Sequence, residues 1–238
     1  MKTTGTDLIP EIVPAESWDE EFVVKHSIPS STRQEPAKAL LLFSELLHLG
    51  PSTRVLDAGS GNGRNAIYLA KRGCKVTAVD FADSAISATR RSAKQAGLED
   101  NIVVVKHSID DPLPFPDHSF DFVLDAYTFC HFLGDAIGQR FWSAMSRVVR
   151  PRGQLLSIAF SPEDEYYAQF LADGPDGSLV RDPSNGIWKR LYTEDQIRSL
   201  FSPIFELQYF TRFEFSDIVF GESYRRVVFA SVLRNTLQ

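Results

Sequence analysis

Cysteine and long apolar runs are scarce in this chain of 238 residues. Its two cysteines, Cys74 and Cys130, stand far apart and lack metal-ligand spacing, so we expect neither a disulfide framework nor a metal site. No apolar run approaches the about 20 residues that span a bilayer. Residues 1–14 carry a single lysine and no apolar core, unlike a signal peptide. We therefore expect a cytoplasmic protein without membrane partners.

An excess of basic residues is also missing. The formal net charge is −6 and the sequence pI is about 5.4. A nucleic-acid or anionic membrane surface would call for a basic face, so neither is expected as a partner. Hydrophobic residues make up 43% and charged residues 24% of the chain, as in ordinary soluble globular proteins. The length suits one α/β domain with additions.

The stretch from Val55 to Arg64 is the most informative in the chain. An apolar run, residues 54–56, is typical of a buried parallel strand and ends in Asp57. Glycines follow at positions 59, 61 and 63, and residues 65–72 then show helical spacing. Strand, glycine turn and helix in this order form a nucleotide-binding loop, because glycine allows the main chain to approach a ligand closely.

A second predicted strand, residues 75–79, places Asp80 at the same edge of the sheet. In doubly wound sheets an acid at this point binds the ribose hydroxyls. The dinucleotide fingerprint calls for a third glycine where Arg64 stands. An NAD(P)-dependent oxidoreductase therefore remains only a remote alternative.

Asp57 with Gly59, Gly61 and Gly63, followed by a helix and Asp80, resembles motif I of the class I S-adenosylmethionine-dependent methyltransferases. Within that family, residues 63–73 look most like small-molecule enzymes of the tellurite-resistance and ubiquinone-biosynthesis types. The resemblance implies S-adenosylmethionine as the cofactor. It places Asp57 at the amino end of the methionine tail, and Gly59 and Gly61 along that tail.

The same resemblance assigns further contacts to the cofactor. Asp80 would hold the ribose, and Asp125 would sit near the sulfonium. Phe81 directly follows the ribose acid, so its ring either lies against the adenine or packs in the core. Residues 107–121 resemble the family's adenine-reading segment, in which the usual acid position falls on Ser108. Either Ser108 with the Ile109 amide reads the adenine, or the loop shifts and Asp110 does so. A carboxylate would form the stronger hydrogen bond with the exocyclic amine.

The remaining pattern predicts a Rossmann-like, doubly wound sheet of seven strands with helices on both faces. The sheet is expected to be mostly parallel with an antiparallel C-terminal strand. Strands at 205–213 and 226–233 would form the terminal hairpin, joined by a long connection over 214–224. We expect residues 1–50 to form an N-terminal lid and residues 51–238 the methyltransferase domain. An insertion around 161–190 would line the acceptor pocket.

Methyl transfer from a sulfonium depends mainly on alignment of donor and acceptor. A base is needed only if the acceptor arrives protonated. His131 is the candidate, since an imidazole with a pKa near about 6.5 is usable at neutral pH. We predict a small-molecule acceptor with an O, N or S nucleophile. The alternative is a methyltransferase-like protein that methylates a macromolecule or binds the cofactor without turnover.

Overall fold

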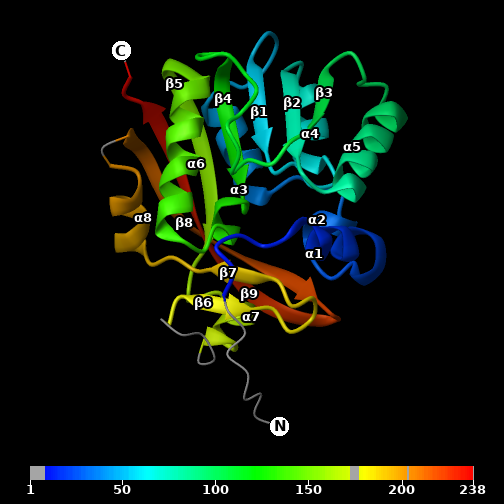
Figure 1. Ribbon diagram of the computed structural model, residues 1–238, viewed down its shortest axis with the longest axis vertical. Coiled ribbons are helices and arrows are strands. Elements are labelled where there is room, and N and C mark those ends of the chain that lie inside the picture. The colour runs from blue at the N-terminus through cyan, green and yellow to red at the C-terminus, as the bar shows by residue number, and fades with distance from the viewer. Residues whose placement is uncertain (1–8, 172–176, 203, 238) are drawn as a thin grey trace.

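The computed structural model describes residues 9–171, 177–202 and 204–237. A seven-stranded sheet forms its centre, in the order β3-β2-β1-β4-β5-β9-β8 (Figure 1). Its strands are β1 (Arg54–Ala58), β2 (Lys75–Asp80), β3 (Ile102–Lys106), β4 (Phe120–Ala126), β5 (Val149–Phe160), β8 (Phe205–Val219) and β9 (Glu222–Asn235). β1 to β5 are parallel, whereas β9 pairs antiparallel with both β5 and β8. The predicted fold class is confirmed.

Helices cover both faces of the sheet. The helices among the described residues are α1 (Ala15–Glu20), η1 (Glu21–Lys25), α2 (Pro29–Thr32), α3 (Lys38–Leu46), α4 (Arg64–Lys71), α5 (Asp83–Ala96), η2 (Phe129–His131), α6 (Asp135–Val148), α7 (Glu165–Ala168) and α8 (Glu194–Leu200), of which α3 to α6 and α8 pack on the sheet. Side chains of α3, α4 and α5 form one buried cluster, and those of α6 and α8 form another. Neighbouring strand residues alternate between the two clusters: Val55 belongs to the first and Leu56 to the second.

The terminal hairpin is longer than the sequence analysis expected. The predicted connection over 214–224 is wrong, because β8 continues to Val219 and β9 begins at Glu222. The turn consists of Phe220 and Gly221, both with positive φ, as tight hairpin turns require. The alternation of phenylalanine with polar residues at 213–216 is a strand pattern.

Two segments outside the sheet lie at the carboxyl ends of its parallel strands (Figure 1). One is the N-terminal segment, residues 9–50. The other is the segment between β5 and α8, in which α7 precedes the antiparallel pair β6 (Leu179–Arg181) and β7 (Trp188–Arg190). The predicted division into lid, domain and insertion stays a prediction, although both segments meet at the edge where a ligand is expected.

A steric constraint at Gly63 leads to the first prediction. Gly63 has φ +82, and a Cβ there would lie 2.7 Å from Thr89 Cγ2; Gly97 has φ +66 with nothing within 4 Å. We expect Gly97→Ala to lower the free energy of unfolding by about 1–2 kcal/mol, the cost of the left-handed conformation. Gly63→Ala should cost about 1–3 kcal/mol more because of overpacking. Urea unfolding followed by circular dichroism measures both, and equal losses would contradict the steric argument.

Candidate active site

A cavity of about 490 Å³ opens where the carboxyl ends of the parallel strands meet the two added segments. Such a place is where open α/β sheets bind ligands. Most of the predicted site residues lie together in its lining, namely Gly59, Gly61, Asp80, Phe81, Ser108, Ile109 and His131. Asp57 and Asp125 are not among the residues that line it.

The glycine loop after β1 is tied to the end of β2. The amides of Gly59 and Ser60 both donate to the Val79 carbonyl, at 2.9 Å each. The Gly61 amide donates to Asp80 Oδ2 at 2.9 Å. A Cβ on Gly59 would overlap the side chain of Thr128, so only glycine fits there. The loop therefore brings bare backbone to the cavity, as close binding of a cofactor tail demands.

Asp80 is buried beside this loop and lines the cavity. Its second oxygen accepts from the Ala82 amide at 3.0 Å. Burial raises the pKa of the Asp80 carboxyl to about 6. Each carboxylate oxygen has two lone pairs, so capacity remains for ribose hydroxyls. The cavity thus leaves Asp80 accessible for the predicted contact with a ribose, and that contact stays a prediction.

Asp57 lies deeper than the sequence pattern indicated. It belongs to β1, where it pairs with Ala78 and Leu124, and is 1% exposed. Burial, reinforced by the Asp80 charge, raises the pKa of the Asp57 carboxyl to about 7. Its Oδ2 atom has no hydrogen-bond partner among the described residues. In this structure Asp57 does not reach the cavity, and its assignment to the methionine tail stays a prediction.

Asp125 anchors the loop that follows β4. Its carboxylate accepts from the Ser157 hydroxyl at 2.7 Å and from the amides of Thr128 and Phe129 at 3.1 and 3.0 Å. Burial raises the pKa of the Asp125 carboxyl to about 6. These contacts position Thr128, which does line the cavity. The proposed place of Asp125 near a sulfonium is likewise untested.

The two alternatives for adenine recognition are directly linked. The Ser108 hydroxyl donates to Asp110 Oδ1. Ser108 and Ile109 line the cavity, whereas Asp110 does not. The position of the loop thus favours the Ser108 and Ile109 pair, with Asp110 orienting the hydroxyl from behind.

His131 lines the cavity but is a weak base. Its Nδ1–H donates to the Trp188 carbonyl at 2.9 Å, and the ring packs edge-on against Trp18 with 4.7 Å between centroids. Burial and the nearby charge of Lys189 lower the pKa of His131 to about 3. The ring is therefore neutral at physiological pH and accepts a proton poorly, which disfavours the predicted base role without testing it.

The cavity lining also contains aromatic and cationic residues to which the sequence analysis gave no individual role: Tyr127, Phe160, Tyr167, Lys189 and Arg226. Tyr167 and Lys189 belong to the insertion around 161–190 that was expected to line the acceptor pocket, whereas Arg226 was not foreseen. Tyr127 has φ +68, a strained conformation that clusters at functional sites. Its position directly after strand β4 was the available signal. Lys189 and Arg226 lie on β7 and β9, and no local motif marks them.

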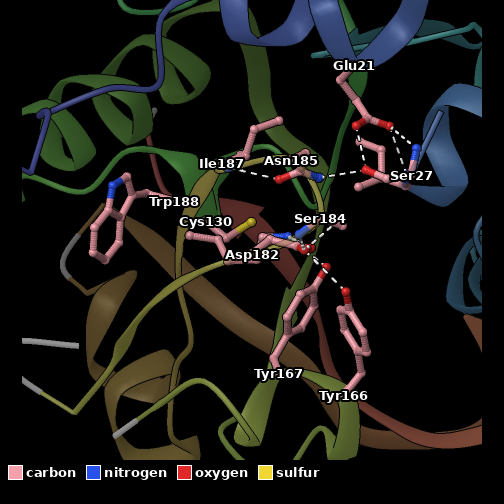
Figure 2. A network of polar contacts seen from close by, with 12 residues as sticks. Glu21, Ser27, Cys130, Tyr166, Tyr167, Asp182, Ser184, Asn185, Ile187 and Trp188 are labelled. Atoms are coloured by element: carbon pink, nitrogen blue, oxygen red, sulfur yellow. Dashed lines mark hydrogen bonds and ion pairs between the residues drawn. The ribbon is translucent and has the colours of Figure 1, made fainter. Parts of the chain in front are cut away.

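Polar contacts join the N-terminal segment to the insertion (Figure 2). Asn185 Nδ2 donates to the Ser27 hydroxyl at 2.9 Å, and Lys25 Nζ donates to the Asn185 carbonyl at 2.9 Å. The buried Glu21 carboxylate accepts from the amides of Ser27 and Ile28 at 2.6 and 2.8 Å. Together these bonds hold both segments over the cavity.

The described part of the chain contains no group of three or more His, Cys, Asp or Glu side chains arranged to bind a metal ion. Within the same residues, no helix is long and apolar enough to cross a membrane.

Comparison with known proteins identifies the domain. Residues 55–153 match the family model described as a methyltransferase domain. The chain contains a class I S-adenosylmethionine-dependent methyltransferase domain. The predicted family, its enzyme class and its cofactor are confirmed for this domain.

The relatives of known function are similar to this chain over only part of their own length. A glycine/sarcosine/dimethylglycine N-methyltransferase of Actinopolyspora halophila is 37% identical over 109 residues, which is 45% of this chain and 19% of that protein. A tRNA 5-carboxymethoxyuridine methyltransferase of Escherichia coli is 30% identical over 140 residues, 56% of this chain and 51% of that protein. The chain thus spans about half or less of these relatives.

Structural similarity to known proteins covers more of this chain than sequence similarity does. The 1,6-didemethyltoxoflavin-N1-methyltransferase of Burkholderia thailandensis, solved with S-adenosylhomocysteine, has a TM-score of 0.70 to this chain at 20% identity. The likeness covers 94% of this chain and 87% of that one. The segments on either side of residues 55–153 therefore belong to the shared architecture.

The buried carboxyl of Asp57 should make stability depend on pH. Its pKa of about 7 in the folded protein exceeds the about 3.9 of an unfolded aspartate. Between these values the folded state binds more protons, so stability falls as pH rises. Asparagine does not titrate, so the Asp57→Asn variant escapes this loss. As the pH rises from about 5 to about 8, the unfolding free energy of the variant minus that of wild type should increase by about 1 kcal/mol or more.

A matched control is Asp121→Asn. Ion pairs with Arg54 and Arg150 stabilise the Asp121 carboxylate, and the pKa of Asp121 is lowered. The pKa of Asp121 lies below the tested pH range in both the folded and the unfolded protein. The difference in unfolding free energy between Asp121→Asn and wild type should therefore stay constant across that range. Urea unfolding at several pH values measures both variants. A pH-independent difference for Asp57→Asn would contradict the assignment.

The imidazole of His131 should not titrate near neutrality. With a pKa of about 3, its NMR ring signals should stay constant between about pH 5 and about pH 8. Comparison with the spectrum of His131→Gln assigns the signals. An inflection near pH ~6.5 would show that the ring is more exposed to water than this structure indicates, and would restore it as a base.

Proposed function

We propose that this domain transfers the methyl group of S-adenosylmethionine to a small-molecule acceptor with an O, N or S nucleophile. One observation carries the proposal: one cavity is lined both by the glycine loop with Asp80 and by a group of aromatic and cationic side chains. Its volume of about 490 Å³ lies within the range of small-molecule sites. The cytoplasm predicted from the sequence suits such an enzyme.

The residues present fit the cofactor. Gly59 lines the cavity, and a side chain there would overlap Thr128, while the Asp80 carboxylate has free lone pairs for the ribose. Ser108 and Ile109 form the part of the lining expected to receive the adenine. When bound, S-adenosylmethionine supplies a methyl group on a sulfonium, which is a good leaving group.

The chain itself contributes alignment and exclusion of water. The bonds of Ser27 with Asn185 and of Lys25 with Asn185 hold the two added segments over the cavity. Fixing two reactants in line can lower the barrier by several kcal/mol, on the order of 7–11 in well-oriented systems. Because His131 is a weak base, we infer that the acceptor binds in its nucleophilic form.

A macromolecular acceptor is the main alternative, since one relative is a tRNA methyltransferase. The net charge of −6 and the cavity volume of about 490 Å³ favour a small molecule. The alternative without turnover predicts binding of S-adenosylmethionine but no release of S-adenosylhomocysteine with any thiol, amine or hydroxyl acceptor. Arg64 stands where the dinucleotide fingerprint needs a third glycine, which disfavours an NAD(P)-dependent oxidoreductase.

Calorimetry tests the cofactor assignment. S-adenosylmethionine should bind and NAD should not. Asp80→Ala should weaken binding at least about tenfold, since a hydrogen bond to a charged group contributes about 1.5–3 kcal/mol. Asp83→Ala is the control, because Asp83 is exposed, pairs with Lys106 and lies outside the cavity lining. Unchanged affinity in Asp80→Ala would refute the ribose contact.

A further inference from the structure

The guanidinium of Arg226 is buried in the cavity lining, and the donors of one of its nitrogens are unused among the described residues. Arg226 is 3% exposed, and its Nε donates to Asp164 Oδ2 at 2.8 Å. Nη1 lies 3.7 Å from Asp217 Oδ2. Nη2 is fully buried and has no hydrogen-bond partner among the described residues.

An unsatisfied charged donor away from water is costly, more so than a neutral one. Arg226 belongs to the residues that line the cavity. An oxygen of a bound molecule would therefore complete the hydrogen bonding of this guanidinium. Arg suits this task because its planar fork matches a carboxylate, and charge-assisted bonds of this kind are about twice as strong as neutral ones.

Aromatic rings surround the guanidinium. Its central carbon lies 5.1 Å from the ring centroid of Tyr167 and 5.2 Å from that of Phe160. Phe160 in turn stacks on Tyr127 with 4.6 Å between centroids and 21° between planes. Rings of this kind accommodate a flat, apolar body by stacking. A second buried cation, Lys189, donates to the Tyr167 hydroxyl at 2.7 Å.

The position of Arg226 separates it from the expected cofactor site. β9 lies three strands from β1 in the order β1-β4-β5-β9, which is about 14 Å at the usual spacing. Asp80, at the end of β2, lies still further along the edge. The backbone of Arg226 is thus well separated from the glycine loop, and its guanidinium packs against Phe160 and Tyr167. We infer that the guanidinium lies at the acceptor end of the cavity and that the methionine carboxylate of the cofactor lies at the glycine loop.

We propose that the acceptor carries a carboxylate on a flat, apolar body, and that Arg226 binds this carboxylate through Nη2. Arg226 is then a specificity-determining residue of the acceptor site. The inference rests on the proposed function, because it takes the glycine loop to be occupied by the methyl donor.

Benzoate and its neutral counterpart benzamide are the probes. Each is titrated by ligand-detected NMR into protein saturated with S-adenosylhomocysteine. Benzoate should bind at least tenfold more tightly than benzamide to wild type. Arg226→Gln should abolish this preference while affinity for S-adenosylhomocysteine stays within about threefold. If removal of one charge unfolds the protein, the double variant Asp164→Asn with Arg226→Gln removes both partners and should show the same loss.

Arg225→Gln is the matched control. Arg225 neighbours Arg226 on β9, but its side chain is half exposed and pairs with Glu214, and it does not line the cavity. The variant should keep the preference for benzoate.

Three outcomes would overturn the inference. The first is a wild type that binds neither probe, or binds both equally. The second is a preference for benzoate that survives loss of the Arg226 guanidinium. The third is benzoate that binds the unloaded protein and is displaced when S-adenosylhomocysteine is added. The last would assign Arg226 to the cofactor's own carboxylate. A wild type that fails to bind S-adenosylhomocysteine would refute the proposed function instead, while the same titrations on unloaded protein would still report whether Arg226 selects a carboxylate.

Discussion

The hydrogen bond from the Gly61 amide to the Asp80 carboxylate joins the ends of β1 and β2, and the geometry of the site depends on it. It sets the glycine loop against the acid that the cofactor's ribose is expected to meet. The loop can lie so close because Gly59 leaves room for Thr128, which Asp125 positions from β4. Three neighbouring strand ends are thereby joined into one surface, and a change in any one would move the others.

Buried charge is the second constraint on this cavity. Burial raises the pKa values of the carboxyls of Asp57, Asp80 and Asp125 and lowers that of His131, so the low polarity of the site affects acids and base alike. An enzyme that transfers a methyl group from a cation benefits from such a dry environment, because water competes as a nucleophile. The same dryness makes the unused nitrogen of Arg226 costly until an anion arrives.

The local sequence pattern was sufficient to predict the secondary structure in the body of the domain. Strand, glycine turn and helix at 54–72 fold as expected, since alternating glycines and helical spacing each have one physical interpretation. The terminal hairpin was misjudged at 214–224, where polar residues on the exposed side of a strand were taken for a connection. Asp57 was placed at the sheet edge because strand ends are uncertain by a residue or two, and one residue decides whether a side chain reaches the cavity.

The sequence by itself determined the fold class, the cofactor family and the glycine loop that is predicted to receive the cofactor, because those depend on residues close together in the chain. Only the tertiary structure decided the acceptor end. Tyr127, Lys189 and Arg226 come from three distant segments, and no spacing in the sequence brings them together. Likewise, the sequence alone suggests an imidazole of ordinary pKa at His131. Its weak basicity arises from burial beside Lys189, an environment that exists only in the folded chain.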